Sequence, residues 1–169
     1  MEIPILTTER LLMRAFRESD LDEYAAMCAD PEVMRYLGEG HTLARWEAWR
    51  QMAMIMGHWQ LRGYGMWAVE EKSTGKLLGR IGCFYPEGWP GFEIGWTLSR
   101  TAWGKGFATE GARAALDFAF HRLDQDHVIS LIRPDNQASI RVAERLGESL
   151  EGSVTLFGGE ALIYGIHRP

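Results

Sequence analysis

The chain has 169 residues, of which 46% are hydrophobic and 24% charged, a composition typical of one globular domain. Its net charge of −5 argues against an extended basic surface for nucleic acid. No apolar run is long enough to cross a membrane, and the first residues lack the basic and apolar regions of a signal peptide. We therefore expect a cytoplasmic protein with no nucleic-acid or membrane partner.

The cysteine pattern argues against a metal site. Cys28 and Cys83 lie far apart and lack the spacing of metal ligands. We interpret both as reduced residues of the core, with a disulfide between them as the alternative. The sequence therefore predicts no metal.

The first third of the chain predicts two extended segments followed by helices. Residues 3–6 and 11–16 are extended, because buried and mixed positions alternate along the second segment. Ser19 begins the first helix, with Asp22 completing a variant of the capping box. The dipeptide Asp30-Pro31 begins a short second helix, since aspartate suits the N-cap and proline the first helical position.

A longer third helix begins at Thr42 or Leu43 and runs to about Leu61, where glycines end it. Its apolar stripe includes several methionines. These form part of the core or, alternatively, an adaptable wall for a ligand or partner. The residues concerned are Met52, Met54 and Met56.

The remaining segments predict a sheet with two further helices. The strands alternate or are short apolar runs bounded by turn residues, and the last two form a hairpin around Gly158 and Gly159. Helices cover residues 107–122 and the segment from Asn136 to Gly147. Because there is no linker or repeat, one mixed α/β domain is predicted. Its strands are residues 66–70, 77–85, 92–98, 128–132, 150–157 and 161–167.

The segment between the third of these strands and the next helix is a candidate anion site. The strand 92–98 leads through a polar elbow to the sequence Trp103-Gly104-Lys105-Gly106-Phe107-Ala108 and then to the helix. Glycines let the backbone approach a ligand closely, and a helix N-terminus adds partial positive charge. A tight turn that only introduces a buried helix is the alternative.

Two motifs together carry a family resemblance. The segments 103–110 and 136–147, about thirty residues apart, resemble the GNAT superfamily of acetyl-CoA-dependent N-acetyltransferases. The opening segment 6–11 and the closing segment 164–166 look like the branch that contains the ribosomal-protein N-terminal acetyltransferases. The resemblance implies a single N-acetyltransferase domain over residues 1–169, with a mixed, mostly antiparallel sheet of about seven strands and about four helices.

The resemblance also implies where acetyl-CoA binds. Trp103 stands where the family's pyrophosphate loop usually has arginine or glutamine, so the phosphates would depend on backbone N–H groups and on Lys105 and the Thr109 hydroxyl. The backbone N–H groups of Thr97 and Leu98 would hold the pantetheine arm and the thioester carbonyl. The expected cofactor-binding residues are therefore Thr97, Leu98, Trp103, Gly104, Lys105, Gly106, Phe107, Ala108, Thr109, Asn136 and Ser139.

The catalytic prediction concerns Glu93 and Ser139. The amine must lose a proton before it attacks, and a half-buried carboxylate such as Glu93 can take it. A strand carboxylate that faces solvent or pairs with an arginine is the alternative. The family's usual acid, a tyrosine after the second motif begins, is absent, since Ala143, Glu144 and Arg145 occupy that region. Ser139 or a water is the expected replacement, although Asn136 and Ser139 equally suit a helix cap.

The sequence thus predicts transfer of acetyl to a primary amine by direct attack in a ternary complex. The acceptor is a protein N-terminus, an amino acid, a polyamine or an antibiotic amine, and its cleft lies between the helix near 46–59, the loop around Trp89 and the final hairpin. A non-catalytic acyl-CoA sensor is the alternative, and a general nucleotide-binding protein is a third reading. The final hairpin, residues 153–166, could pair with a second subunit as a homodimer.

Overall fold

An eight-stranded sheet forms the centre of the protein, and the computed structural model describes residues 2–169. Neighbouring strands are antiparallel except for one parallel pair. The mixed, mostly antiparallel sheet is as predicted, with eight strands in place of about seven. In spatial order the strands are β1 (Leu6–Thr7), β2 (Leu11–Arg14), β3 (Met66–Glu71), β4 (Leu77–Phe84), β5 (Glu93–Leu98), β6 (His127–Ile132), β8 (Gly159–His167) and β7 (Ser149–Leu156).

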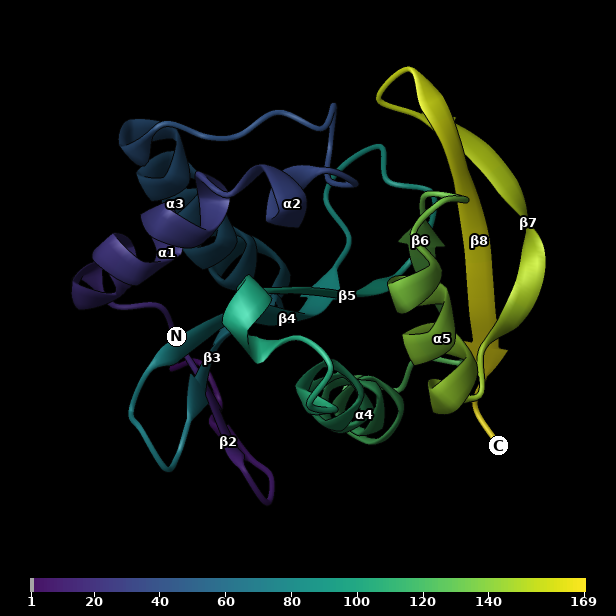
Figure 1. The fold of residues 1–169 in the computed structure, drawn as a ribbon. Coiled ribbons are helices and arrows are strands. Elements are labelled where there is room, and N and C mark those ends of the chain that lie inside the picture. The colour runs from purple at the N-terminus through teal and green to yellow at the C-terminus, as the bar shows by residue number, and fades with distance from the viewer. Residues whose placement is uncertain (1) are drawn as a thin grey trace.

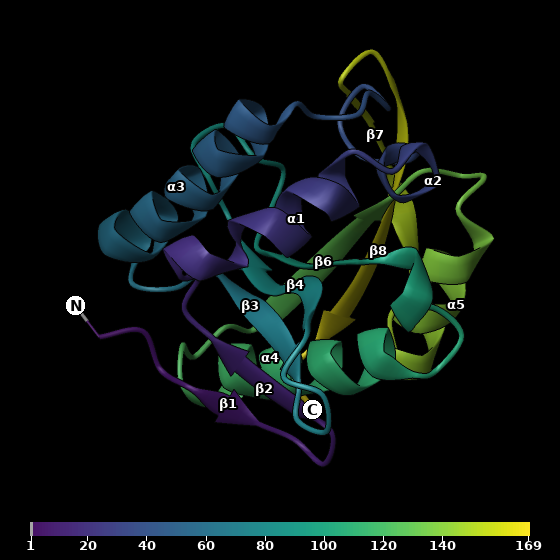
Figure 2. The same ribbon diagram turned by 60° about the vertical axis from the view of Figure 1, so that its left-hand side comes forward.

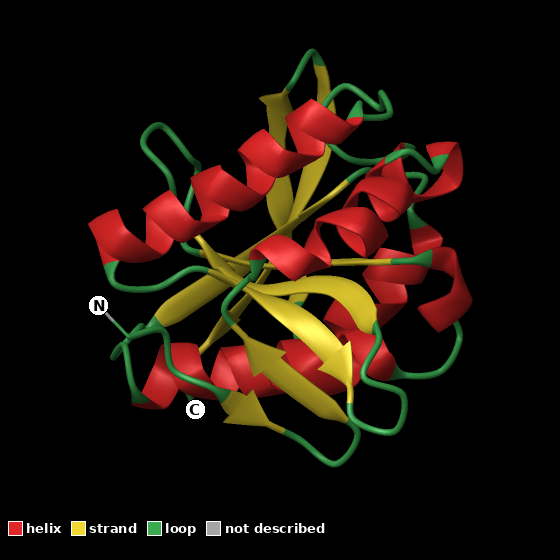
Figure 3. Cartoon of the chain, turned by 90° about the vertical axis from the view of Figure 1, so that its left-hand side faces the viewer, coloured by secondary structure: helices red, strands yellow, loops and turns green. Residues whose placement is uncertain are grey.

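Helices cover both faces of this sheet. Three of them lie together on one face of the central strands, and two lie on the opposite face (Figure 1, Figure 2). The secondary-structure cartoon shows the same layers from the side (Figure 3). None of the helices in residues 2–169 is long and apolar enough to span a bilayer. The first group is α1 (Leu21–Cys28), α2 (Pro31–Met34) and α3 (Arg45–Arg62), and the second is α4 (Phe107–His121) and α5 (Gln137–Leu146).

Local capping chemistry explains most helix boundaries and corrects one prediction. The Asp30 carboxylate accepts a hydrogen bond from the Glu32 N–H at 3.0 Å, and Gly63 ends α3 in the left-handed conformation, as predicted. The predicted Ser19 cap is wrong. A 3-10 turn over Glu18–Asp20 precedes α1, and the Asp20 carboxylate accepts from the Arg17 N–H at 2.7 Å. Asp20 thus caps the start of this turn, and it also pairs with the buried Arg14.

The core fills both sides of the sheet with large aromatic and aliphatic side chains. Trp67 contacts Trp59 from α3 and Phe118 from α4 in edge-to-face geometry, with ring centroids 5.0 and 5.2 Å apart. Cys28 and Cys83 are both buried and both free, which confirms their predicted role as reduced core residues.

The single parallel pair gives the sheet an opening at its centre. Strands β5 and β6 are paired only at Glu93 and Ile129, and beyond this point they diverge. On the far side of β6, the hairpin β7–β8 curves away from the central strands (Figure 1). At the base of that hairpin, the Glu151 carboxylate lies within hydrogen-bond distance of Nε2 of His127. The His127 ring stacks on the ring of His167. The hairpin is thereby tied to β6 while its tip stays near the opening.

Candidate active site

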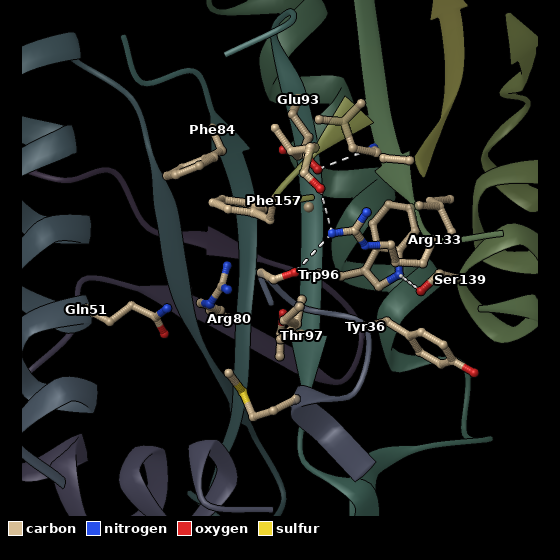
Figure 4. A pocket seen from close by; sticks show the side chains of 18 of the residues that line it. Tyr36, Gln51, Arg80, Phe84, Glu93, Trp96, Thr97, Arg133, Ser139 and Phe157 are labelled. Atoms are coloured by element: carbon tan, nitrogen blue, oxygen red, sulfur yellow. Dashed lines mark hydrogen bonds between the residues drawn. The ribbon is translucent and has the colours of Figure 1, made fainter. Parts of the chain in front are cut away.

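The opening between the strands widens into a cavity of about 600 Å³. Its walls come from α3, from β4, β5 and β6, and from the tip of the β7–β8 hairpin. This is the position that the sequence predicted for the acceptor cleft. Met54, one of the three methionines singled out above, lines it, whereas Met52 is buried in the core. The close view shows the polar residues that face the cavity, among them Gln51, Arg80, Glu93 and Thr97 (Figure 4).

Glu93 is a buried carboxylate in the wall of this cavity. Only 9% of its surface is exposed, so the alternative of a solvent-facing carboxylate is excluded. One oxygen accepts a hydrogen bond from the Trp89 indole N–H at 2.7 Å, and the other from the Leu131 N–H at 3.3 Å. Burial raises the pKa of Glu93 to about 7, against the opposing effects of the two donors and the charge of Arg80. At neutral pH the group therefore accepts and returns protons readily.

The start of α5 lines the same cavity as Glu93. The Asn136 side chain accepts from the Ser139 N–H at 3.2 Å, so the predicted helix cap is confirmed. The Trp96 indole N–H donates to the Ser139 hydroxyl at 3.2 Å and joins this helix end to β5 (Figure 4). Both Asn136 and Ser139 line the cavity.

The regular register of β5 decides which of its peptide groups face the opening. The Ser99 N–H donates to the Leu78 carbonyl at 2.8 Å, and Thr97 lies opposite Arg80 on β4. Because peptide groups alternate in direction along an antiparallel strand, those of Thr97 face β4, and those of Trp96 and Leu98 face the opening. The Thr97 N–H thus points toward β4 and the Leu98 N–H toward the opening, and the binding of cofactor by these two residues stays a prediction.

The glycine elbow has the backbone geometry of an anion site. Gly104 and Gly106 have φ of +71° and +81°, and Gly106 caps α4 without any side-chain hydrogen bond. The N–H groups of the first turn of α4 therefore have no acceptor within the helix. Nearby, the buried Thr109 hydroxyl has no partner within residues 2–169. The elbow does not line the cavity itself; it lies beyond the end of β5, where the Trp103 indole donates to the Leu98 carbonyl at 2.8 Å.

The N-terminal segment holds the elbow in place, a contact that the sequence analysis missed. Arg10 donates to the Lys105 carbonyl at 2.8 Å, and its guanidinium lies 4.3 Å from the centroid of the Phe107 ring. The Glu110 carboxylate accepts from the Thr8 hydroxyl at 2.6 Å and from the Arg10 side chain at 2.7 Å. Glu110 thus joins the turn between β1 and β2 to the first turn of α4.

Two cavity arginines were also missed. Arg133 donates to the carbonyls of Gly38, Leu156 and Glu160 at 2.8 to 3.0 Å, and so clips the loop before α3 to the final hairpin. Arg80 projects from β4 beside Thr97 (Figure 4). Neither belongs to a recognisable motif, and no sequence signal distinguishes them from surface arginines.

The chain matches the family model of the acetyltransferase (GNAT) domain over residues 10–148. The chain belongs to the GNAT family. A relative in Bacillus licheniformis, the uncharacterized N-acetyltransferase p20, is 30% identical over 87% of this chain and 83% of its own length. The acetyltransferase from Agrobacterium tumefaciens str. C58 is 31% identical and has a TM-score of 0.88 over 99% of this chain and 96% of its own.

A further GNAT neighbour is a ribosomal acetyltransferase with its cofactor bound. It is RimL, a ribosomal L7/L12 alpha-N-protein acetyltransferase in complex with coenzyme A, with a TM-score of 0.81 over 97% of this chain and 98% of that chain. At 22% identity this likeness shows the fold alone. The comparisons confirm the predicted resemblance to the GNAT superfamily, and they identify the chain as an N-acetyltransferase. Membership of the ribosomal branch remains a prediction.

Proposed function

We propose that this N-acetyltransferase moves the acetyl group of acetyl-CoA to a primary amine by direct attack in a ternary complex. The observation that carries the proposal is Glu93, a buried carboxylate with a pKa raised to about 7, in the wall of a cavity at the point where β5 and β6 diverge. A group that titrates near neutral pH suits removal of a proton from an ammonium ion.

The residues of the elbow fit the pyrophosphate of coenzyme A. The uncapped first turn of α4 offers N–H groups from Gly106 onward, and the Thr109 hydroxyl nearby has no partner within the described chain. Lys105 of the elbow adds a further donor, and Asn136 and Ser139 at the N-terminus of α5 add donors in the wall of the cavity. Acetyl-CoA, when bound, supplies the activated thioester and leaves as coenzyme A; that RimL binds coenzyme A on the same fold supports this placement.

The chemistry then divides among three groups of this chain. Glu93 takes the proton of the amine, directly or through a water. The N–H groups of Trp96 and Leu98, which face the opening, are placed to stabilise the negative oxygen of the tetrahedral intermediate, an effect worth roughly 3–4 kcal/mol in well-studied hydrolases. Ser139 or a water protonates the departing thiolate, a modest requirement because a thiolate is a fair leaving group near neutral pH.

Binding and turnover together test the proposal. We expect micromolar affinity for acetyl-CoA and coenzyme A by titration calorimetry, no binding of ATP, and release of free thiol when an accepted amine is added. Gly106→Ala should weaken acetyl-CoA binding by at least about tenfold, because it strains the elbow at φ of +81°. Gly63→Ala is the matched control, since Gly63 has φ of +79° at the end of α3, away from the elbow.

Two other results would change the proposal. Binding of acetyl-CoA without thiol release from any amine would favour the acyl-CoA sensor. Equal binding of ATP would favour a general nucleotide site. The homodimer remains a prediction: β7 is an edge strand of the sheet, which leaves it able to pair with a second copy, and a concentration-independent monomer mass would contradict it.

A further inference from the structure

Arg80 is a positively charged group in the cavity wall that has no anionic partner within residues 2–169. Its side chain leaves β4 opposite Thr97 and lines the cavity (Figure 4). One terminal nitrogen lies 3.7 Å from the Met66 sulfur, a weak acceptor, and the buried Nε has no hydrogen-bond partner within residues 2–169. No carboxylate of the described chain lies within ion-pair distance of this guanidinium.

Arg14, a second guanidinium that points into the protein, has different surroundings. Arg14, on β2, is buried and pairs with Asp20 at 2.8 Å and with Glu70 at 2.9 Å. Pairing of this kind is the rule, because a buried charge is costly unless an opposite charge and hydrogen bonds satisfy it. The guanidinium of Arg80 has no such opposite charge within residues 2–169. A ligand bound in the cavity is placed to supply it.

A second donor lies beside Arg80. The Tyr24 hydroxyl donates to the Gln51 side-chain oxygen at 2.5 Å, which orients the amide of Gln51. The amide NH₂ of Gln51 is then left without a partner among the hydrogen bonds of the described chain, and Gln51 lines the same cavity (Figure 4). A planar guanidinium with an amide donor next to it suits the oxygens of a carboxylate or a phosphonate.

A carboxylate, that of Glu93, lies further along the same cavity wall. Glu93 lies four residues from Thr97 on β5, which places the backbones at the two sites about 13 Å apart. Both side chains face one cavity of about 600 Å³, which is also lined by Arg133, whose guanidinium donates to carbonyls of the loop before α3 and of the hairpin. The cavity thus offers a carboxylate at one end and a guanidinium at the other to a small molecule.

From this arrangement we propose that the acceptor is a small amine that also carries an anionic oxygen group, as in a free amino acid, and that Arg80 binds this group while the amine lies toward Glu93. The inference rests on the proposed function and narrows its acceptor. It excludes polyamines and polycationic amines, because an ammonium ion beside Arg80 is repelled. Arg80 is a specificity-determining residue in this scheme and takes no part in proton transfer.

Paired acceptors that differ only in the anion test the proposal. Thiol release from acetyl-CoA is measured with each of the common amino acids, with its C-terminal amide, with aminoalkylphosphonates and with spermidine. For the accepted amino acid, kcat/KM should exceed that of its amide by about 10- to 100-fold, the usual effect of a hydrogen-bonded charge. Activity with carboxylates or with phosphonates identifies which anion the site prefers, and either supports the proposal.

Variants separate binding of the anion from other effects of Arg80. Arg80→Gln should lower kcat/KM for the acid through KM, leave the amide nearly unchanged and so remove the preference, and Arg80→Lys should restore part of it. Arg122→Gln, an exposed arginine at the end of α4, is the control. Calorimetric titration of the amino acid into protein saturated with coenzyme A gives a readout independent of turnover, and Arg80→Gln should abolish that binding.

The outcomes distinguish this proposal from the proposed function. Equal rates for acid and amide, equal losses of both in Arg80→Gln, or a preference for peptides or spermidine would overturn the role of Arg80 and leave the acetyltransferase activity standing. If acetyl-CoA binds but no amine of any charge releases thiol, the proposed function fails, and the acceptor inference fails with it.

Discussion

Two buried glutamates, Glu93 and Glu148, show that the same desolvation can have different consequences in different surroundings. Glu93 lies at the start of β5 and lines the cavity, whereas Glu148 lies between α5 and β7 and does not. Both are buried, and in both burial is the largest cause of a raised pKa, to about 7 for Glu93 and to about 8 for Glu148. The difference between them comes from their neighbours.

Glu93 has two N–H donors that favour its charged form, whereas the one donor to Glu148, the Ser130 hydroxyl, is shared with a backbone carbonyl. Trp89 and Leu131 donate N–H groups to Glu93, whereas Glu148 contacts only the Ser130 hydroxyl at 3.0 Å and its other oxygen has no partner within residues 2–169. The single hydrogen of that hydroxyl also points at the Ile94 carbonyl, 2.8 Å away. A protonated Glu148 resolves the conflict by donating to Ser130, which then donates to Ile94. One glutamate is thus placed to exchange protons, and the other to keep one.

The largest expected effect is the loss of activity in Glu93→Gln. We expect kcat to fall by about 10²- to 10⁴-fold, the usual contribution of a general base, with acetyl-CoA affinity nearly unchanged. Glu148→Gln is the matched control, because it changes a carboxyl of similar burial that does not face the cavity. Thiol release at pH 8 measures both rates. Equal losses of activity in the two variants would contradict the assignment of Glu93, and not Glu148, as the base.

Glu148→Gln should instead change how stability depends on pH. The folded-state pKa of about 8 lies above the ordinary value of 4.5, so the folded state holds a proton that the unfolded state releases. The wild-type free energy of unfolding should therefore fall as pH rises from about 4.5 to about 8. In Glu148→Gln this fall should be smaller, by about 2–4 kcal/mol between pH 5 and pH 8.

Urea denaturation at several pH values measures this difference. Glu144→Gln, an exposed position on α5, provides the control and should follow the wild type. An unchanged pH dependence in Glu148→Gln would show that Glu148 ionises normally in the folded protein.

Ser130→Ala should be destabilising without a large effect on turnover. The change removes the hydroxyl that satisfies both Glu148 and the Ile94 carbonyl, and an unsatisfied buried polar group costs about 1–3 kcal/mol. Glu93 makes no hydrogen bond to Ser130, so kcat should stay within a few-fold of wild type. Denaturation at pH 6 together with the thiol assay checks both parts, and a loss of rate without a loss of stability would place Ser130 in the chemistry.

Trp89→Phe should give the smallest change, a shift of the pH profile. The substitution keeps an aromatic ring beside Phe84 and removes the N–H that favours the charged form of Glu93. Because the base works when deprotonated, kcat/KM should rise with pH through the pKa of Glu93. In the variant that pKa is higher, so the rising limb should move toward alkaline pH by less than about one unit, with the plateau retained. Comparing both proteins on one acceptor cancels the titration of the amine, and a shift toward acid would oppose the assignment.

Local chemistry made much of the fold predictable. The Asp30 cap, the Asn136 cap and the glycine that ends α3 depend on residues a few positions apart, and each was predicted from sequence. The Ser19 cap failed because Asp20, one residue later, is also held by Arg14 of β2, a contact that spacing along a helix does not reveal.

In the candidate site, too, some residues could be recognised from local sequence and others could not. The elbow at residues 103–109 and Glu93 at the head of its strand lie within one strand–turn–helix unit, so their pattern could be recognised. The direction of the Thr97 N–H required the register between β4 and β5. Arg80, Arg133 and Glu148 belong to no motif, and their importance comes from what lies opposite them in space.

The sequence by itself determined the helices, the strands, the family and the residues of the elbow, because caps, turns and periodic apolar patterns act over a few residues. Only the tertiary structure decided which buried carboxyl lines the cavity, and which arginine has no ion-pair partner within residues 2–169. The physical reason is that desolvation and charge pairing depend on every group that packs around a side chain. For Glu93 and Arg80 those groups come from segments that lie far apart in the chain.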